Sequence, residues 1–191
     1  IQAVIHFAGL KSAKDSVLNP LHYWDVNVNG TINLLRAMNK YKCKTIVFSS
    51  SATIYGLSSD RPLPENTDIK PINPYGRTKA VIEQLLHDLY ESQPGKWRIA
   101  NLRYFNPIGA HPSGLIGEAP FGVPSNIFPF ITQVAAGNLD KLTIFGNDWP
   151  TLDGTGVRDY IHVLDLAEGH IAALKYLVEN INQVLNLNLG T

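Results

Sequence analysis

Cysteine is nearly absent from the chain, which has Cys43 as its single thiol among 191 residues. One thiol cannot form an internal disulfide, so a reducing compartment is favoured and we expect the cytoplasm. An excess of charge is missing as well, because 16 basic residues balance 16 acidic ones. We therefore expect neither nucleic acid nor an anionic membrane as a partner. No apolar run approaches the roughly 20 residues that span a bilayer.

Two kinds of site motif are also lacking. The six histidines show no H-x-H or H-x-x-x-H spacing, and His162 and His170 are eight residues apart. We therefore expect no metal site. The glycine-rich fingerprint of dinucleotide-binding proteins is absent too, because "GLIGEAPFG" (residues 114–122) has the wrong spacing and follows no strand–turn–helix pattern.

What the chain does contain is an alternation of strand-like and helix-like segments. Strands are predicted at 1–8, 44–51, 97–105, 142–145 and 183–189, and helices at 20–41, 74–91, 127–137 and 163–180. Two long loops, 58–74 and 106–126, separate them. This order predicts an α/β fold, with a doubly wound parallel sheet covered by helices on both faces. In such sheets the working groups follow the carboxyl ends of the strands, which here read "FAGLK", "FSSSATIYG" and "RYFNPIGAH".

The clearest candidate catalytic motif is "NPYGRTK", which places Tyr75 and Lys79 four residues apart at the start of a helix. Side chains with this spacing lie on one helical face. A free tyrosine has a pKa near 10, and a nearby cation stabilises its phenolate, so such a tyrosine can accept a proton from a sugar or alcohol hydroxyl. Ser51, which closes the preceding strand, is a third candidate. A lone Y-x-x-x-K is common, and serines at the end of a strand often cap helices. The prediction of a catalytic site therefore depends on the two occurring together.

Seven segments, in this order along the chain, resemble one family. They are "FAGLK", "VNVNGT", "FSSSATIYG", "NPYGRTK", "LRYFNPIGAHPSG", "IFGND" and "DGTGVRDYIHVLDLAEGH". Together they are similar to the UDP-glucose 4-epimerases, a branch of the extended short-chain dehydrogenases/reductases, over essentially the whole chain. The resemblance implies a Rossmann-like fold and tightly held NAD. It further implies that a UDP-sugar loses its C4 hydride to the nicotinamide and regains it on the other face.

The resemblance also implies site residues. Tyr75 would be the base, Lys79 would lower the pKa of Tyr75 and bind the ribose, and Ser51 would contact the sugar 4-hydroxyl. Phe7, Ala8, Gly9 and Lys11 of "FAGLK" would line the cofactor, with Asn27, Ser49, Tyr104 and Pro107 nearby. The UDP-sugar would be held by residues of the later half of the chain, namely Asn106, Asn126, Ile127, Thr143, Phe145 and Arg158.

Four of these later residues also have an ordinary interpretation. Arg158 could form a solvent salt bridge with Asp159, the two asparagines could be turn residues, and Phe145 could belong to the core. A dehydratase is disfavoured, because Ala52 and Thr53 stand where dehydratases usually carry an acidic pair. An epimerase of another nucleotide sugar and a non-catalytic nucleotide-binding module stay open.

The resemblance finally implies an organisation. Residues 1–105 would form a partial NAD-binding domain, and residues 106–191 would be mostly a substrate-binding region with segments that return to the sheet. The family carries its glycine loop ahead of the position of Ile1, so we expect an internal fragment that is weak or inactive alone. Two copies of the full-length protein could pair through the helices at about 20–41 and 74–91.

Overall fold

The computed structural model of the chain describes residues 1–57, 62–118, 120, 122, 124, 126–181 and 183–191. Its centre is a four-stranded sheet in the order β1-β2-β3-β6, and all neighbouring strands are parallel. These strands are β1 (Val4–His6), β2 (Thr45–Ser51), β3 (Arg98–Tyr104) and β6 (Val184–Leu189). A separate parallel pair joins β4 (Asn106–Ile108) to β5 (Tyr160–His162).

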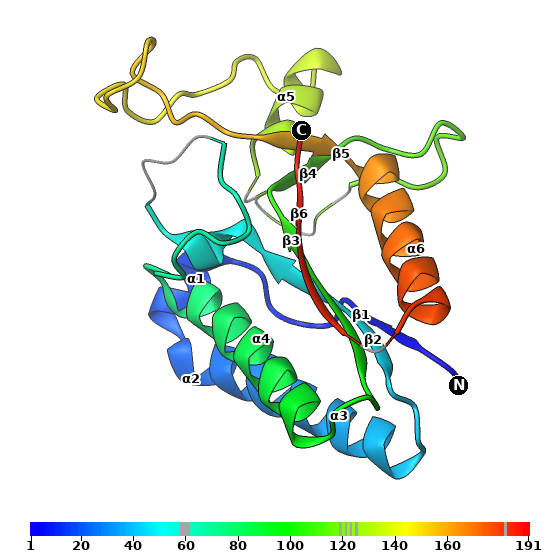
Figure 1. Ribbon diagram of the computed structural model, residues 1–191. Helices are drawn as coiled ribbons and strands as arrows, with labels where there is room; N and C mark the ends of the chain where they lie inside the picture. Colours follow the sequence, from blue (N-terminus) through cyan, green and yellow to red (C-terminus); the bar gives the residue numbers. More distant parts are fainter. Residues whose placement is uncertain (58–61, 119, 121, 123, 125, 182) are drawn as a thin grey trace.

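Helices cover both faces of the sheet, as the sequence predicts (Figure 1). One face carries α3 (Gly30–Lys40) and α4 (Pro74–Ser92), and the other carries α6 (Val163–Glu179). The shorter elements are α1 (Ala13–Leu18), α2 (Pro20–Tyr23), the π-helix η1 (Trp24–Asn29), the 3₁₀ turn η2 (Ala52–Tyr55) and α5 (Ile127–Ala135). Among the described helices, none is both long and apolar enough to cross a membrane.

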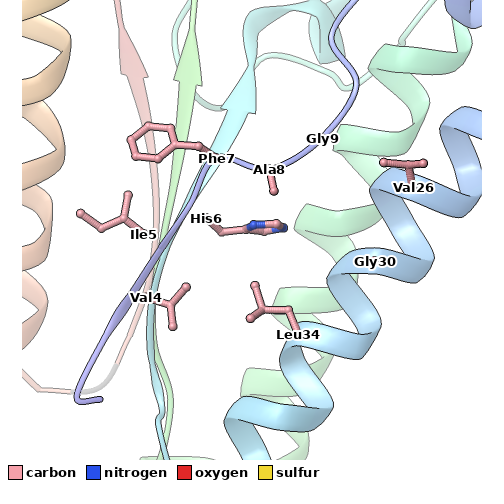
Figure 2. A pocket seen from close by; sticks show the side chains of 9 residues that line it. All are labelled: Val4, Ile5, His6, Phe7, Ala8, Gly9, Val26, Gly30 and Leu34. Atoms are coloured by element: carbon pink, nitrogen blue, oxygen red, sulfur yellow. The ribbon is translucent and has the colours of Figure 1, made fainter.

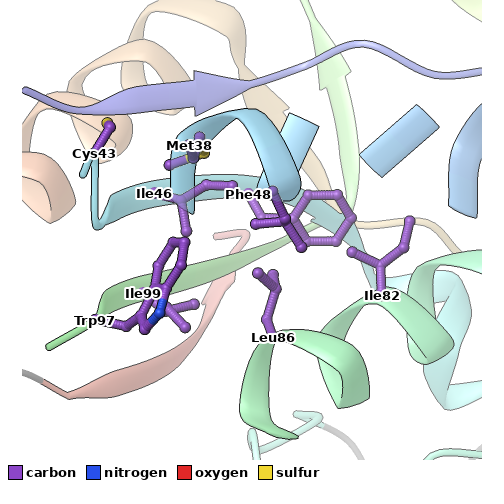
Figure 3. Close-up of a cluster of buried hydrophobic side chains, with 9 residues drawn as sticks. Met38, Cys43, Ile46, Phe48, Ile82, Leu86, Trp97 and Ile99 are labelled. Carbon is purple, nitrogen blue, oxygen red and sulfur yellow. The ribbon is translucent and has the colours of Figure 1, made fainter. Parts of the chain in front are cut away.

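The core has two layers because successive strand residues point to opposite faces. On the α3/α4 side, Ile46, Phe48 and Ile99 of the sheet meet Ile82 and Leu86 of α4 (Figure 3). On the α6 side, a second cluster brings together Val47, Ala100, Leu102, Ala173 and Leu177. Strands β2 and β3 are thus buried on both faces, which holds their carboxyl ends at fixed positions.

Helix α4, which carries the Tyr75/Lys79 pair, has a well-defined start. The Asn73 side chain caps it by accepting a hydrogen bond from the backbone N–H of Gly76 at 2.8 Å, and Pro74 occupies the first turn. Both features favour helix initiation at this position. The buried face of α4 includes Thr78, Lys79 and Glu83 beside apolar residues. Polar side chains are therefore directed at the sheet from a fixed helix.

Four local differences separate the predictions from the structure, and the first is that the predicted loop 106–126 contains the strand β4. The strand predicted at 142–145 is wrong: these residues form no strand, and Ile144 and Phe145 are 69% and 92% exposed. The short helix α1, capped by Ser12, is not predicted by the sequence. The helix predicted at 20–41 exists, but its middle is the π-helix η1. Parts of both predicted loops, residues 58–61, 119, 121, 123 and 125, lie outside the described residues.

Candidate active site

The three residues of the predicted catalytic set come from two neighbouring elements. Ser51 is the last residue of β2, Tyr75 lies in the first turn of α4, and Lys79 follows one turn later. The ammonium of Lys79 lies 5.8 Å from the centre of the Tyr75 ring, so the two side chains share one helical face. Ser51 and Lys79 are buried, and Tyr75 is half-buried. The spacing argument is confirmed on this point.

Burial dominates the electrostatics of Lys79, because the residue is only 5% exposed. Its ammonium donates a hydrogen bond to the carbonyl oxygen of Ser49 at 2.6 Å and lies 4.8 Å from the centre of the Phe48 ring. Loss of water lowers the pKa of Lys79 to about 8, and the charge of Glu83 acts in the opposite direction. Lys79 is therefore mostly charged at pH 7 and loses its proton about one pH unit higher.

The pKa of Tyr75 is shifted in the direction opposite to the prediction. Burial raises it above the ordinary value, a hydrogen bond with Ser51 opposes this, and Tyr23 adds to the rise. The physical reason is the burial of the phenol, which disfavours its charged form, while the nearby Lys79 ammonium donates to the Ser49 carbonyl oxygen. In the chain alone, the pair at neutral pH is a phenol next to an ammonium, and a further positive charge is needed to favour the phenolate.

A pH-dependent stability follows from Lys79. Because its folded pKa lies below the unfolded value of 10.5, burial penalises the folded state fully below pH 8. The penalty disappears as the pH rises from about 8 to 10.5. Compared with Lys79→Met, the unmodified chain should gain roughly 2–3 kcal/mol in free energy of unfolding between pH 7 and pH 10.

This difference is measured by urea denaturation of both chains at the two pH values. The exposed Lys175 provides the matched control, since Lys175→Met should track the unmodified chain at both. A difference between the unmodified chain and Lys79→Met that stays constant with pH would contradict the assignment.

The loop after β1 is held by Asn27, which lies in the π-helix and is 2% exposed. Its side-chain oxygen accepts from the backbone N–H of Leu10 at 2.7 Å, and its amide donates to the Leu10 carbonyl at 3.0 Å and to Thr78 Oγ1 at 3.1 Å. Asn27 therefore uses its polar atoms to position the loop, not to present them to a ligand. π-helical turns recur at functional sites, and this one aims Asn27 at α4.

Within that loop, Gly9 has a φ of +154°, and an added Cβ would lie 3.0 Å from the Asn27 side-chain oxygen. A side chain here would crowd the contact that fixes the loop. Phe7, Ala8 and Lys11 are exposed beside it. The loop thus offers open backbone and one large apolar ring next to the strand ends.

A cavity of about 510 Å³ opens between this loop, β1 and the helices η1 and α3. Figure 2 shows Val4, His6, Ala8 and Leu34 directed toward it from both sides. Its size falls within the range of small-molecule and cofactor sites, and its lining is mostly apolar.

Tyr104 closes β3 beside α6 and is joined to His170. The Tyr104 hydroxyl is hydrogen-bonded to His170 Nε2, and Nδ1 of His170 is bonded to the Leu166 carbonyl. The Phe7 ring lies 4.8 Å from the His170 ring. Burial raises the pKa of Tyr104 to about 12, against a hydrogen bond from Ser49. Tyr104 therefore stays protonated, and the cluster links the loop after β1 to the far side of the sheet.

The predicted substrate residues are mostly exposed, and those with hydrogen bonds make them within the later segments. Asn106 is half-buried, and its amide donates to the Asp159 carbonyl at 2.8 Å. The Asn126 amide donates to Glu118 at 3.1 Å, and Arg158 Nη1 donates to its neighbour's carbonyl, that of Val157, at 2.8 Å. Most of the set is exposed, namely Asn126, Ile127, Thr143, Phe145 and Arg158, and so is Pro107 of the predicted cofactor set. The segment around 140–158 projects beyond the sheet (Figure 1).

The alternative interpretations of two of these residues are wrong. Phe145 is not part of the core, since it is 92% exposed. The Asp159 carboxylate accepts from the backbone N–H of Thr191 at 3.1 Å, and no ion pair with Arg158 is found in the described part of the chain. The same part of the chain holds no group of three metal-ligating side chains.

Sequence reasoning missed a buried polar cluster one helical turn beyond Lys79, between α4 and the sheet. Its centre is an ion pair between Glu83 of α4 and Arg103 of β3, with nitrogen and oxygen 2.7 Å apart. Ser50 and Tyr55 are bonded to this pair. The sequence indicates only part of this cluster. Glu83 stands four residues after Lys79, but nothing in the sequence pairs Glu83 with a residue of a later strand.

Comparison with known proteins places this geometry in context. The chain matches the family model described as "NAD dependent epimerase/dehydratase family" over residues 1–189. It is 54% identical to UDP-glucose 4-epimerase of Bacillus subtilis (strain 168), and the match covers 100% of the chain and 56% of that protein. The chain thus spans about half the length of the curated relatives it matches, between 47% and 56%.

Solved structures agree with the fold. A UDP-glucose 4-epimerase of Stenotrophomonas maltophila, with bound NAD and formylated UDP-arabinopyranose, superposes with a TM-score of 0.94 at 53% identity, covering 100% of the chain and 56% of that structure. The enzyme of Bifidobacterium longum, in complex with NAD⁺ and UDP, gives the same TM-score at 48% identity and the same coverage. By its sequence and its Rossmann-like sheet, the chain belongs to the NAD-dependent epimerase/dehydratase family.

Proposed function

We propose that the protein containing this chain interconverts UDP-galactose and UDP-glucose by transient oxidation at C4 of the sugar. The observation that carries the proposal is the convergence of Ser51, Tyr75 and Lys79 at the carboxyl end of β2. Relatives at 54% identity over the whole chain bear the name UDP-glucose 4-epimerase. Their similarity supports the reaction type and the nucleotide sugar.

In this proposal Tyr75 accepts the proton of the sugar 4-hydroxyl, and Ser51 hydrogen-bonds to the same oxygen. Lys79 keeps a positive charge on the helical face of Tyr75. NAD, when bound, supplies a hydride acceptor and a positively charged ring. Since the pKa of Tyr75 is raised in the chain alone, a second positive charge is what the site needs to turn the phenol into a base.

The residues present fit a dinucleotide. Lys79 has three N–H donors and uses one on Ser49, so among the described contacts it retains donors for a ribose hydroxyl. Gly9 leaves the backbone of the loop accessible, and Phe7 is 60% exposed and able to pack on a ring. We propose that Ala8, Lys11, Ser49, Tyr104 and Pro107 complete the contact surface, and that Asn27 contributes by holding the loop.

The later loops would bind the nucleotide sugar. We propose Asn106, Asn126, Ile127, Thr143, Phe145 and Arg158 for this role, with residues 106–191 as mostly a substrate region. Apart from the half-buried Asn106, these residues are exposed and therefore available to a ligand. Arg158 suits a pyrophosphate, because its guanidinium presents a planar fork of donors.

The test is the conversion of UDP-galactose by the natural gene product that contains this chain. UDP-glucose should accumulate to equilibrium, whereas the 191-residue chain alone should be weak or inactive. UDP-N-acetylgalactosamine and a UDP-pentose, assayed in parallel, separate a UDP-hexose epimerase from the other nucleotide-sugar epimerases. Lack of turnover with every UDP-sugar would leave nucleotide binding without catalysis as the function.

A further inference from the structure

The ion pair of Glu83 and Arg103 is held by two nitrogen atoms of the guanidinium. Arg103 Nη2 lies 2.7 Å from Glu83 Oε2, and Arg103 Nε lies 3.1 and 3.2 Å from the two carboxylate oxygens. The side chains are only 3% and 5% exposed. Two-point pairing of this kind fixes the orientation of a carboxylate as well as its charge.

Arg103 is in turn held from its other side. Its Nη1 donates to the hydroxyl of Tyr55 and to the backbone carbonyl of Glu65, both at 2.8 Å. The Tyr55 hydroxyl donates onward to Asn188 of β6 at 2.6 Å. The orientation of the Glu83 carboxylate is thus set by η2, by the segment around residue 65 and by two strands.

The same carboxylate reaches the end of β2. Glu83 Oε1 accepts a hydrogen bond from the Ser50 hydroxyl. Ser50 directly precedes Ser51, and both are buried. A contact that fixes Ser50 therefore fixes the piece of backbone from which the Ser51 hydroxyl projects toward Tyr75.

Glu83 also lies one helical turn after Lys79, on the same buried face of α4. The titratable groups around the Lys79 ammonium are Tyr75 and Glu83 on its own helix and His6 on β1. Burial lowers the pKa of Lys79 and the negative charge of Glu83 raises it, while burial and the Lys79 charge lower the pKa of His6. Within this group, Glu83 provides the compensating charge.

We propose that Glu83, held by Arg103, is a positioning residue for the proposed reaction, which fixes the strand end carrying Ser51 and places a negative charge one turn from Lys79. Only the predicted effect of Glu83 on turnover rests on the proposed function. Its effect on Lys79 is a property of this chain and is measured without substrate.

The experiment uses two variants of the pair and one control. Glu83→Gln keeps the shape and the acceptor for Ser50, and the double variant Glu83→Gln/Arg103→Met avoids a lone buried guanidinium if the single variant does not fold. Glu91→Gln, an exposed position on the same helix, is the matched control. Folding of each is checked by circular dichroism, and Lys79 is titrated by NMR of its ¹³C-labelled side chain, assigned with Lys79→Met.

In folded Glu83→Gln, Lys79 should titrate about half a pH unit or more below its position in the unmodified chain, and in the double variant the shift should keep this direction but be smaller, because the Arg103 charge is removed as well. In the natural gene product, the fall of turnover at high pH should begin lower by the same amount, with kcat reduced roughly tenfold. Glu91→Gln should change neither. A loss of rate at every pH with an unmoved Lys79 titration would overturn the proposal. Failure of the gene product to convert UDP-sugars would sink the proposed function, and the titration would still decide the role of Glu83.

Discussion

Tyr75→Phe should lower the turnover of UDP-galactose by the natural gene product by about 10²–10⁴-fold. The substitution removes one oxygen, the atom proposed to take the sugar hydroxyl proton, and leaves the ring and the helix in place. Tyr75 is half-buried in the first turn of α4, and its hydroxyl interacts with Ser51. The large effect should therefore fall on kcat, with KM changed little, since ring packing is preserved.

The matched control is Tyr41→Phe, because Tyr41 is 74% exposed at the end of α3. Its turnover should equal that of the unmodified protein. Denaturation of Tyr75→Phe should also resemble that of the unmodified protein to within about 1 kcal/mol, the usual net worth of one hydrogen bond. Unchanged turnover in Tyr75→Phe would exclude Tyr75 as the base, and the proposed chemistry with it.

Arg103→Met should destabilise the chain by about 3–5 kcal/mol in free energy of unfolding. The substitution leaves the Glu83 carboxylate buried with no partner of opposite charge on β3. It also removes the Arg103 N–H that donates a hydrogen bond to the Tyr55 hydroxyl. Most of the cost is that of an uncompensated buried charge and not the value of the ion pair itself. Urea denaturation at pH 7 measures it.

The double variant Glu83→Gln/Arg103→Met separates these two contributions. Because it removes both charges, it should be clearly more stable than Arg103→Met alone. Arg36→Met is the surface control: Arg36 is exposed on α3, and its loss should cost less than about 0.5 kcal/mol. If Arg103→Met were as mild as Arg36→Met, or if the double variant were no more stable than the single one, the buried charge would not govern this region.

Much of the fold could be predicted because its strands and helices are periodic and long. Strand β2 lies within the predicted 44–51, and α4 begins at Pro74 as its proline and buried face indicate. The segment 142–145 failed because β-branched and aromatic letters form a strand only when a partner strand is present, and these residues lie exposed. Local propensity gave no means of telling the two situations apart.

The candidate site could be predicted where it depends on one helix and not where it depends on contacts between elements. The i, i+4 spacing correctly placed Tyr75 beside Lys79. The raised pKa of Tyr75 in the chain alone was not predicted, because the sequence cannot show how deeply the phenol is buried. Asn27 was identified as a cofactor contact, but its polar atoms hold Leu10 and Thr78 across the fold.

The most direct test of the central claim follows the hydrogen on C4 of the sugar. The natural gene product is incubated with UDP-galactose deuterated at C4, and the UDP-glucose formed is analysed by mass spectrometry and NMR. Oxidation at C4 and return of the same hydride predicts that deuterium stays on C4 of the product. Absence of UDP-glucose, or UDP-glucose whose deuterium has exchanged with water, would contradict the account.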